Sequence, residues 1–196
     1  MPSDPTILAF DTSAAHCAAA LLRGREIITS RAEAMSRGQA ERLMPMLEDI
    51  LAQGGCAWSD LDAIGVGVGP GNFTGIRISV SAARGLALGL GVPAVGVSGF
   101  DALMELGGAD QIPCIPAPRD QVYVQAVGDD PRLMPRVEAE ALGPLFSCND
   151  PDQHVQAIAR LTAERWRDVS APPAPLYVRP ADAAPSRDVP PVMLDE

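Results

Sequence analysis

Residues 62–98 hold the arrangement that most constrains the fold of this chain. A short apolar run at 62–69 is followed by a glycine-rich turn, by a long helical pattern at 73–91, and by a second short apolar run at 92–98. This order is typical of a right-handed β-α-β unit, in which two parallel strands lie side by side and a helix crosses one face of the sheet. The sequence therefore predicts an α/β fold.

The segments before this unit predict three strands and one helix. Residues 6–13, 16–22 and 25–33 are rich in apolar residues and are separated by short breaks that suit hairpins. Residues 36–55 change to helical spacing, with Pro45 inside the pattern and Gly54-Gly55 as its stop. Proline lacks an amide donor, so we expect Pro45 to kink or loosen the first turns.

The pattern is weaker after Ser98 and predicts a smaller second subdomain. Helical patterns cover 100–108 and 151–166, the latter with Asp150 as its N-cap, and strand patterns cover 112–118 and 121–127. From 171 onward the chain is rich in proline and has no periodicity, which favours a linker or a poorly ordered tail. The predicted units are an N-terminal subdomain (1–99), a C-terminal subdomain (100–175) and a tail (176–196).

Composition excludes several kinds of chemistry. All 15 basic residues are arginine, so no lysine is present to form a Schiff base or to complete a Walker A motif. A net charge of −10 argues against binding nucleic acid without a partner. The four cysteines form no C-x-x-C pair, which predicts reduced thiols in the cytoplasm and no zinc site. No apolar run reaches the roughly 20 residues that cross a bilayer, so we expect no membrane association.

The turn GVGPGNFTGIR, residues 67–77, leaves two interpretations open. Backbone amides of a glycine-rich strand-to-helix turn can bind phosphate, but the P-loop and G-x-G-x-x-G patterns both fail here. The alternative is a rigid turn closed by Asn72 or Thr74 as the helix cap. Residues 11–13 follow the first strand and could orient Mg²⁺ and phosphate, or could simply form a polar turn. The weak candidates for nucleotide or phosphate binding are Asp11, Thr12, Ser13, Gly69, Gly71, Asn72 and Thr74.

The order and spacing of four blocks resemble the TsaB (YeaZ) family of tRNA threonylcarbamoyladenosine biosynthesis proteins. The blocks are ILAFDTSAAHCAAALL, ERLMPMLEDIL, DLDAIGVGVGPGNFTGIRISVSAARGLALGLGVPAVGVSGFDAL and QVYV, and the resemblance is dense over residues 6–105. It implies an actin/Hsp70/sugar-kinase-like fold of two RNase H-like halves, the second degenerate or shortened. It also implies a non-catalytic subunit that binds the catalytic paralogue TsaD together with the ATPase TsaE, and that meets tRNA only through this complex.

The resemblance places the contact with TsaD, or with a second copy when TsaD is absent, on the first two helices. Small residues on the second helix would allow a close approach, and methionines on the first offer an apolar patch. The candidate interface residues are Leu43, Met44, Met46, Leu47, Ile50, Ile76, Val80, Ala83 and Ala87. No tightly bound cofactor is implied, although ATP or ADP with Mg²⁺ can act at the level of the complex.

Two rival activities remain to be compared with this interpretation. A phosphotransferase of the same fold would use Asp11 as a Mg²⁺ anchor, and a glycoprotease-like peptidase would need a metal or a paired serine and histidine. The catalytic paralogue holds its metal with an H-x-x-x-H pair, whereas this chain has only His16 and His154, far apart in sequence. We expect both imidazoles to be exposed or half-buried, with no catalytic or metal-binding role.

The sequence departs from the family pattern at three places. Gln39 stands where many relatives have histidine, Val68 where they have a basic residue, and Pro116-Ala117-Pro118 where they have Asp-Ala-Arg. These changes remove side chains that could do chemistry and leave the apolar blocks intact, as expected of a protein that acts through its surface.

Overall fold

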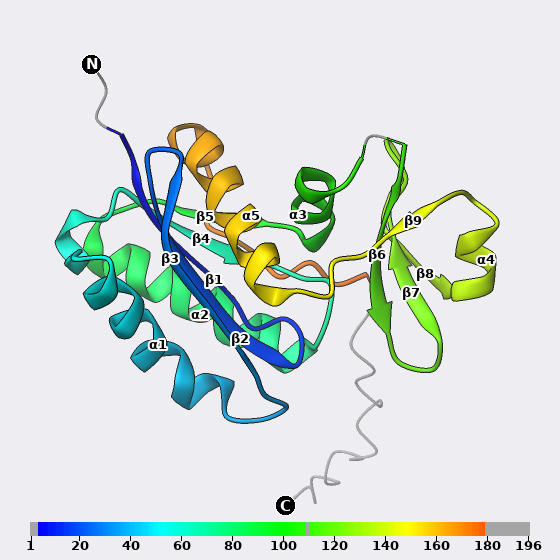
Figure 1. Cartoon of the computed structure of the whole chain (residues 1–196), viewed down its shortest axis with the longest axis horizontal. Coiled ribbons are helices and arrows are strands. Elements are labelled where there is room, and N and C mark those ends of the chain that lie inside the picture. The colour runs from blue at the N-terminus through cyan, green and yellow to red at the C-terminus, as the bar shows by residue number, and fades with distance from the viewer. Residues whose placement is uncertain (1–3, 109, 179–196) are drawn as a thin grey trace, which may run out of the picture.

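The first five strands form one mixed sheet in the order β3-β2-β1-β4-β5. The computed structural model describes residues 4–108 and 110–178, and the strands are β1 (Thr6–Asp11), β2 (His16–Arg23), β3 (Glu26–Ala34), β4 (Ala63–Gly67) and β5 (Ala94–Val97). The first three pair antiparallel, whereas β4 pairs parallel with β1 and with β5. This order is that of an RNase H-like sheet, and the predicted α/β class is confirmed (Figure 1).

Helices cover both faces of this sheet. α1 (Gln39–Gln53) and α2 (Phe73–Leu90) lie on one face, and α3 (Gly99–Leu106) and α5 (Pro151–Arg165) lie on the other (Figure 1). Side chains of a strand alternate between its faces. Leu8 and Phe10 therefore pack with the cluster under α1 and α2, while Ile7 and Ala9 pack with the cluster under α5. The central strand β1 is buried along its whole length.

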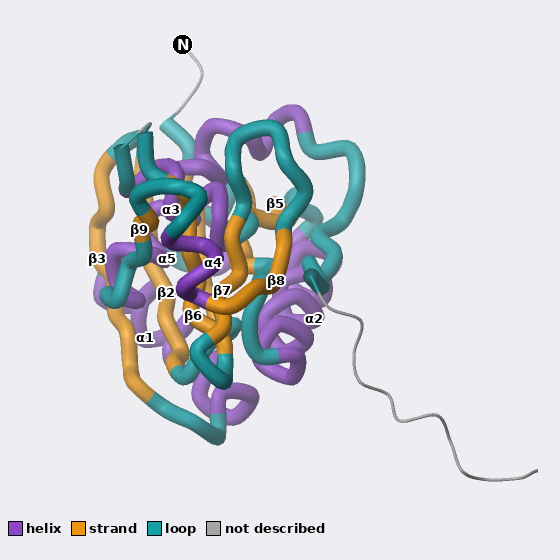
Figure 2. The backbone as a smooth tube through the Cα atoms, turned by 90° about the vertical axis from the view of Figure 1, so that its right-hand side faces the viewer, coloured by secondary structure: helices purple, strands orange, loops and turns teal. Residues whose placement is uncertain are grey.

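A second, smaller sheet has the order β8-β7-β6-β9. It contains β6 (Ile112–Ala117), β7 (Gln121–Val124), β8 (Arg132–Pro135) and β9 (Leu145–Phe146), with α4 (Arg136–Glu140) between the last two. Figure 2 shows this sheet in front of the larger one. Its own buried cluster is small, with Cys114, Val122, Val124 and Ala139, so most of the apolar core lies around the first sheet.

Most elements agree with the sequence prediction. The three N-terminal strands, the β-α-β unit and both helices after it are present, Asn72 caps α2, and Asp150 caps α5. Helix α1 runs through Pro45 and ends before Gly54, as its stop signal predicted. The elements β8, α4 and β9 were not predicted, because each has five residues or fewer and shows no periodicity.

The predicted boundary at residues 99–100 does not separate two packing units. Helices α3 and α5 lie beyond it in sequence, yet Ala102, Val155 and Ile158 pack with side chains of the first sheet. The expected poorly ordered tail also differs at its start, because the amide of Leu176 donates to the carbonyl of Val68 (2.8 Å). The rest of the predicted tail, 179–196, lies outside the described residues. In the part that is described, no helix combines the length and the apolar character needed to span a bilayer.

Candidate functional site

A cavity of about 500 Å³ lies between the two sheets. The loops after β1 and β4 form one side of it, strands β6 and β7 form another, and the segment that leads into α5 closes the third. Loops at the carboxyl ends of parallel strands are where α/β proteins place their ligands. The cavity is therefore the main candidate for a functional site.

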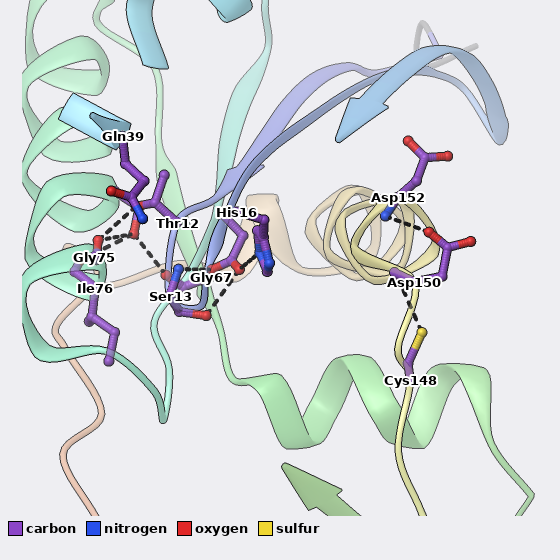
Figure 3. A network of polar contacts seen from close by, with 12 residues as sticks. Thr12, Ser13, His16, Gln39, Gly67, Gly75, Ile76, Cys148, Asp150 and Asp152 are labelled. Carbon is purple, nitrogen blue, oxygen red and sulfur yellow. Dashed lines mark hydrogen bonds and ion pairs between the residues drawn. The ribbon is translucent and has the colours of Figure 1, made fainter. Parts of the chain in front are cut away.

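Asp11, the last residue of β1, lies at the polar end of this cavity with its carboxylate buried. Its Oδ2 lies 2.7 Å from Nε2 of His16 and accepts a hydrogen bond from the Ser13 hydroxyl (3.0 Å), and its Oδ1 accepts one from the Ser13 amide (3.2 Å). Figure 3 shows Ser13 and His16 turned toward this point. Burial raises the pKa of Asp11, but the hydrogen bond and charge of His16, the charge of His154 and the Ser13 hydroxyl outweigh it and hold the pKa below its ordinary value.

His16 and His154 line the same cavity although 137 residues lie between them in the sequence. Both imidazoles are half-buried, as expected, but the sequence did not predict that they lie at the same cavity; that they have no catalytic or metal-binding role stays a prediction. Helix α5 packs across β1 and β2, which brings its first turn, and with it His154, to the loop that follows β1. Burial lowers the pKa of His154, while the nearby charge of Asp11 opposes that shift. Across 4–108 and 110–178, no group of three or more His, Cys, Asp or Glu side chains could hold a metal ion.

Of the seven candidate phosphate-binding residues, the structure brings four to the cavity: Asp11, Ser13, Gly71 and Asn72. Thr12 is buried and its hydroxyl donates to the carbonyl of Gly75 (2.7 Å). Gly69 lies against Ile76 and the carbonyl of Leu176, and exposed Thr74 sits in the first turn of α2 without lining the cavity.

Three amides of the turn and of the loop after β1 donate to acceptors within the chain. The Asn72 amide donates to the Ser13 carbonyl (2.6 Å), the Gly75 amide to the Asn72 side chain (2.9 Å), and the Ser13 amide to Asp11. A phosphate site of this kind needs such amides free and pointing at the anion. The geometry therefore favours the interpretation of the turn as a rigid connection that holds the start of α2 against the loop after β1.

Seven of the nine candidate interface residues belong to the core of the chain itself. The side chains of this set are 3% exposed or less: Leu43, Met46, Leu47, Ile50, Ile76, Val80 and Ala83. They cannot contact a partner while the core is intact, so this choice of residues is corrected. Met44 is exposed and Ala87 is half-buried. An interface on these two helices, which stays a prediction, must use their outward faces.

The outward side of α2 is suited to contact. We call it the outer α2 face, and its exposed members are Arg77, Ser81, Arg84, Gly85, Leu88 and Gly89. Leu88 is 87% exposed, and a methyl group added at Gly85 or Gly89 would meet no atom within 4 Å. At the start of the helix, the Arg77 guanidinium stands over the Phe73 ring (4.4 Å) and Tyr177 packs against that ring (5.1 Å between centroids).

Known proteins similar to this chain agree with the fold and the sequence blocks. A family model described as TsaD, tRNA N6-adenosine threonylcarbamoyltransferase, matches residues 25–146. Uncharacterized proteins of Mycobacterium bovis and Mycobacterium tuberculosis are 32% identical over 199 residues, which cover 92% of this chain and 94% of each relative.

Two solved structures from Pseudomonas aeruginosa are similar over almost their full length. A protein described as similar to the peptidase YEAZ has a TM-score of 0.76 and 28% identity, covering 89% of this chain and 100% of that one. YeaZ has a TM-score of 0.68 and 26% identity, covering 88% and 99%. The fold is therefore the actin-like, sugar-kinase-type fold that the sequence predicted.

Proposed function

The chain belongs to the TsaD family as a TsaB-like member, and from this premise we propose that it is a non-catalytic subunit in tRNA threonylcarbamoyladenosine modification. In this proposal it docks onto a catalytic TsaD-type subunit, works with a TsaE-type ATPase in the cytoplasm, and meets tRNA only through the assembly. ATP or ADP with Mg²⁺ then acts in the assembly and not on the isolated chain.

The observation that carries the proposal is the outer α2 face. Leu88, 87% exposed and placed between the uncovered glycines Gly85 and Gly89, gives a protruding apolar side chain beside a flat backbone surface, so that a partner helix can approach closely. Arg84 lies one helical turn before Leu88 and Arg77 two turns before Arg84 on the same face, and arginine is among the residues enriched in protein interfaces. A face of this composition has no role in the core of its own chain.

Charge also supports pairing of two copies when no catalytic subunit is present. The outward side of α1 carries Glu41 and Glu48, whereas that of α2 carries Arg77 and Arg84. A two-fold contact that places α2 of one copy against α1 of the other brings opposite charges together at both ends. The same surface then serves the homodimer and the complex with the catalytic subunit, so that the two compete.

The polar end of the cavity argues against the rival activities. The Ser13 hydroxyl donates to Asp11 and not to His16, so no base activates it as the nucleophile of a peptidase. A phosphotransferase would have to bind Mg²⁺ at Asp11, but that carboxylate already accepts bonds from His16 and Ser13. Both arrangements favour a structural role for this cluster.

Binding between this chain and a purified TsaD-type subunit tests the proposal. Leu88→Arg removes the protruding side chain and adds a like charge one helical turn after Arg84, and we expect at least about a tenfold loss of affinity in calorimetry. Leu142→Arg is the matched control, since Leu142 is 50% exposed but lies after α4 in the smaller sheet region. Equal affinity of the two variants, with melting temperatures unchanged, would contradict docking through the outer α2 face.

A further inference from the structure

The cavity between the sheets has two walls of different chemistry, and neither wall contains a residue of the outer α2 face. The wall from α3 and the smaller sheet is apolar, with Leu103, Ile115, Pro116 and Pro118, and it also carries the ring of Tyr123. The opposite wall holds Asp11, Ser13 and His16. At about 500 Å³ the space lies within the roughly 300–1,000 Å³ that is usual for small-molecule sites.

No lysine or arginine lines this cavity within the described parts of the chain. Its titratable lining groups are Asp11, His16, His154, Tyr123 and two cysteines. Burial keeps the pKa of His154 below its usual value, so that this imidazole is neutral at pH 7, and His16 is already bonded to Asp11. A phosphorylated ligand would bring its charge beside a carboxylate with no fixed cation to pair it, and an unpaired buried anion is costly.

His154 is the polar group that the folded chain leaves for a ligand. It lines the cavity from the first turn of α5, and no described residue forms a hydrogen bond with its imidazole. A neutral imidazole offers one donor and one acceptor. Asn149 and Tyr123 line the same space and carry an amide and a hydroxyl. A few convergent polar groups in a mainly apolar pocket are the usual pattern of a ligand site.

We propose that this cavity binds an uncharged, ring-containing molecule of about nucleoside size. Its ring packs against Ile115 and the neighbouring prolines, and its polar substituents exchange hydrogen bonds with His154. The site differs in ligand class from a nucleotide site, because no Lys or Arg side chain lines it in the described residues to neutralise a polyphosphate. It is a property of the isolated chain and does not depend on docking through the outer α2 face.

Three ligands that share the same ring system but differ in charge test the proposal. Adenosine, AMP and ATP, the last two with Mg²⁺, are titrated into the isolated chain in a calorimeter at neutral pH. We expect saturable binding of adenosine at one site and a loss of affinity with each added charge, at least about tenfold between adenosine and ATP. Absence of saturable adenosine binding, or ATP binding as tight as that of adenosine, overturns the proposal.

Two substitutions locate the binding. His154→Phe keeps a ring but removes the donor and acceptor, and Ile115→Trp fills the space with a larger side chain, so each should weaken adenosine binding by about tenfold or more. Leu88→Arg, on the outer α2 face, should leave it unchanged, which separates this result from that of the docking test. Unaltered adenosine affinity in the Ile115→Trp variant, with its melting temperature close to that of the parent, places binding elsewhere and overturns the assignment.

Discussion

The two glycines Gly75 and Gly85 lie on the same helix, α2, yet the same substitution should change stability in opposite directions. A methyl group at Gly75 would overlap the carbonyl oxygen of Thr12, a backbone atom that cannot rotate away. A methyl group at Gly85 meets nothing within 4 Å. The pair therefore isolates the effect of close packing from that of helix propensity.

The magnitudes follow from three contributions. Alanine is favoured over glycine in a helix by about 1 kcal/mol, which is the whole effect at Gly85. At Gly75, overpacking costs roughly 1–3 kcal/mol. The displacement of α2 that relieves this overlap also weakens the buried hydrogen bond from the Thr12 hydroxyl to the Gly75 carbonyl (2.7 Å), which is worth about 1 kcal/mol. Gly85→Ala should be more stable than the parent by about 1 kcal/mol, and Gly75→Ala less stable by about 2 kcal/mol.

Urea unfolding followed by circular dichroism measures both free energies. The comparison is made at concentrations where size-exclusion chromatography shows monomers, because Gly85 lies on the outer α2 face. If Gly75→Ala were as stable as Gly85→Ala, the glycine turn would not be required for close approach of α2 to the loop after β1, and our interpretation of that turn would fail.

Three further predictions concern single side chains. Leu43→Ala should lower the free energy of unfolding by about 2–5 kcal/mol and neighbouring Met44→Ala by less than about 1 kcal/mol, since the first is buried and the second exposed; similar losses in urea unfolding would contradict the burial pattern. Burial raises the pKa of Cys17 to about 11, so iodoacetamide at pH 8 should alkylate half-buried Cys148 first, as peptide mass spectrometry can verify. Burial lowers the pKa of His154 from 6.5 in the folded chain, so the unfolded chain binds more protons as the pH falls through this range, and the folded state loses stability. His154→Phe should remove this contribution of His154 to the pH dependence of stability, which is at most about 1.4 kcal/mol per pH unit. An unchanged dependence of the unfolding free energy on pH would contradict the lowered pKa.

Local patterns in the sequence were sufficient for most elements of the larger sheet. The hairpin breaks at Gly24 and around Ala14, the cap at Asn72 and the stop at Gly54 each act within a few residues, so the chain around them determines the outcome. The position of α5 was not accessible in this way. Its apolar stripe, with Val155 and Ile158, shows that one side is buried but not which sheet buries it.

The same limit explains why the interface residues were misassigned and why the shared position of the two histidines was not predicted. Helical periodicity identifies an apolar stripe on α1, but a stripe that packs on the sheet and one that faces a partner have the same composition, and Leu43 and Leu47 proved to be core. His16 and His154 are separated by most of the chain, and no spacing rule reports a contact made only when α5 crosses β1 and β2. The tertiary fold alone brings them to Asp11.

The path of the chain has a mechanical consequence. Helices α3 and α5 both pack on the larger sheet, so the segment from β6 to β9 is an insertion between these two helices. Both ends of this insertion border the cavity, at Leu103 of α3 and at Pro151 at the start of α5. A rotation of the smaller sheet about these two ends would widen or narrow the cavity, so a ligand that contacts both cavity walls would restrict that rotation.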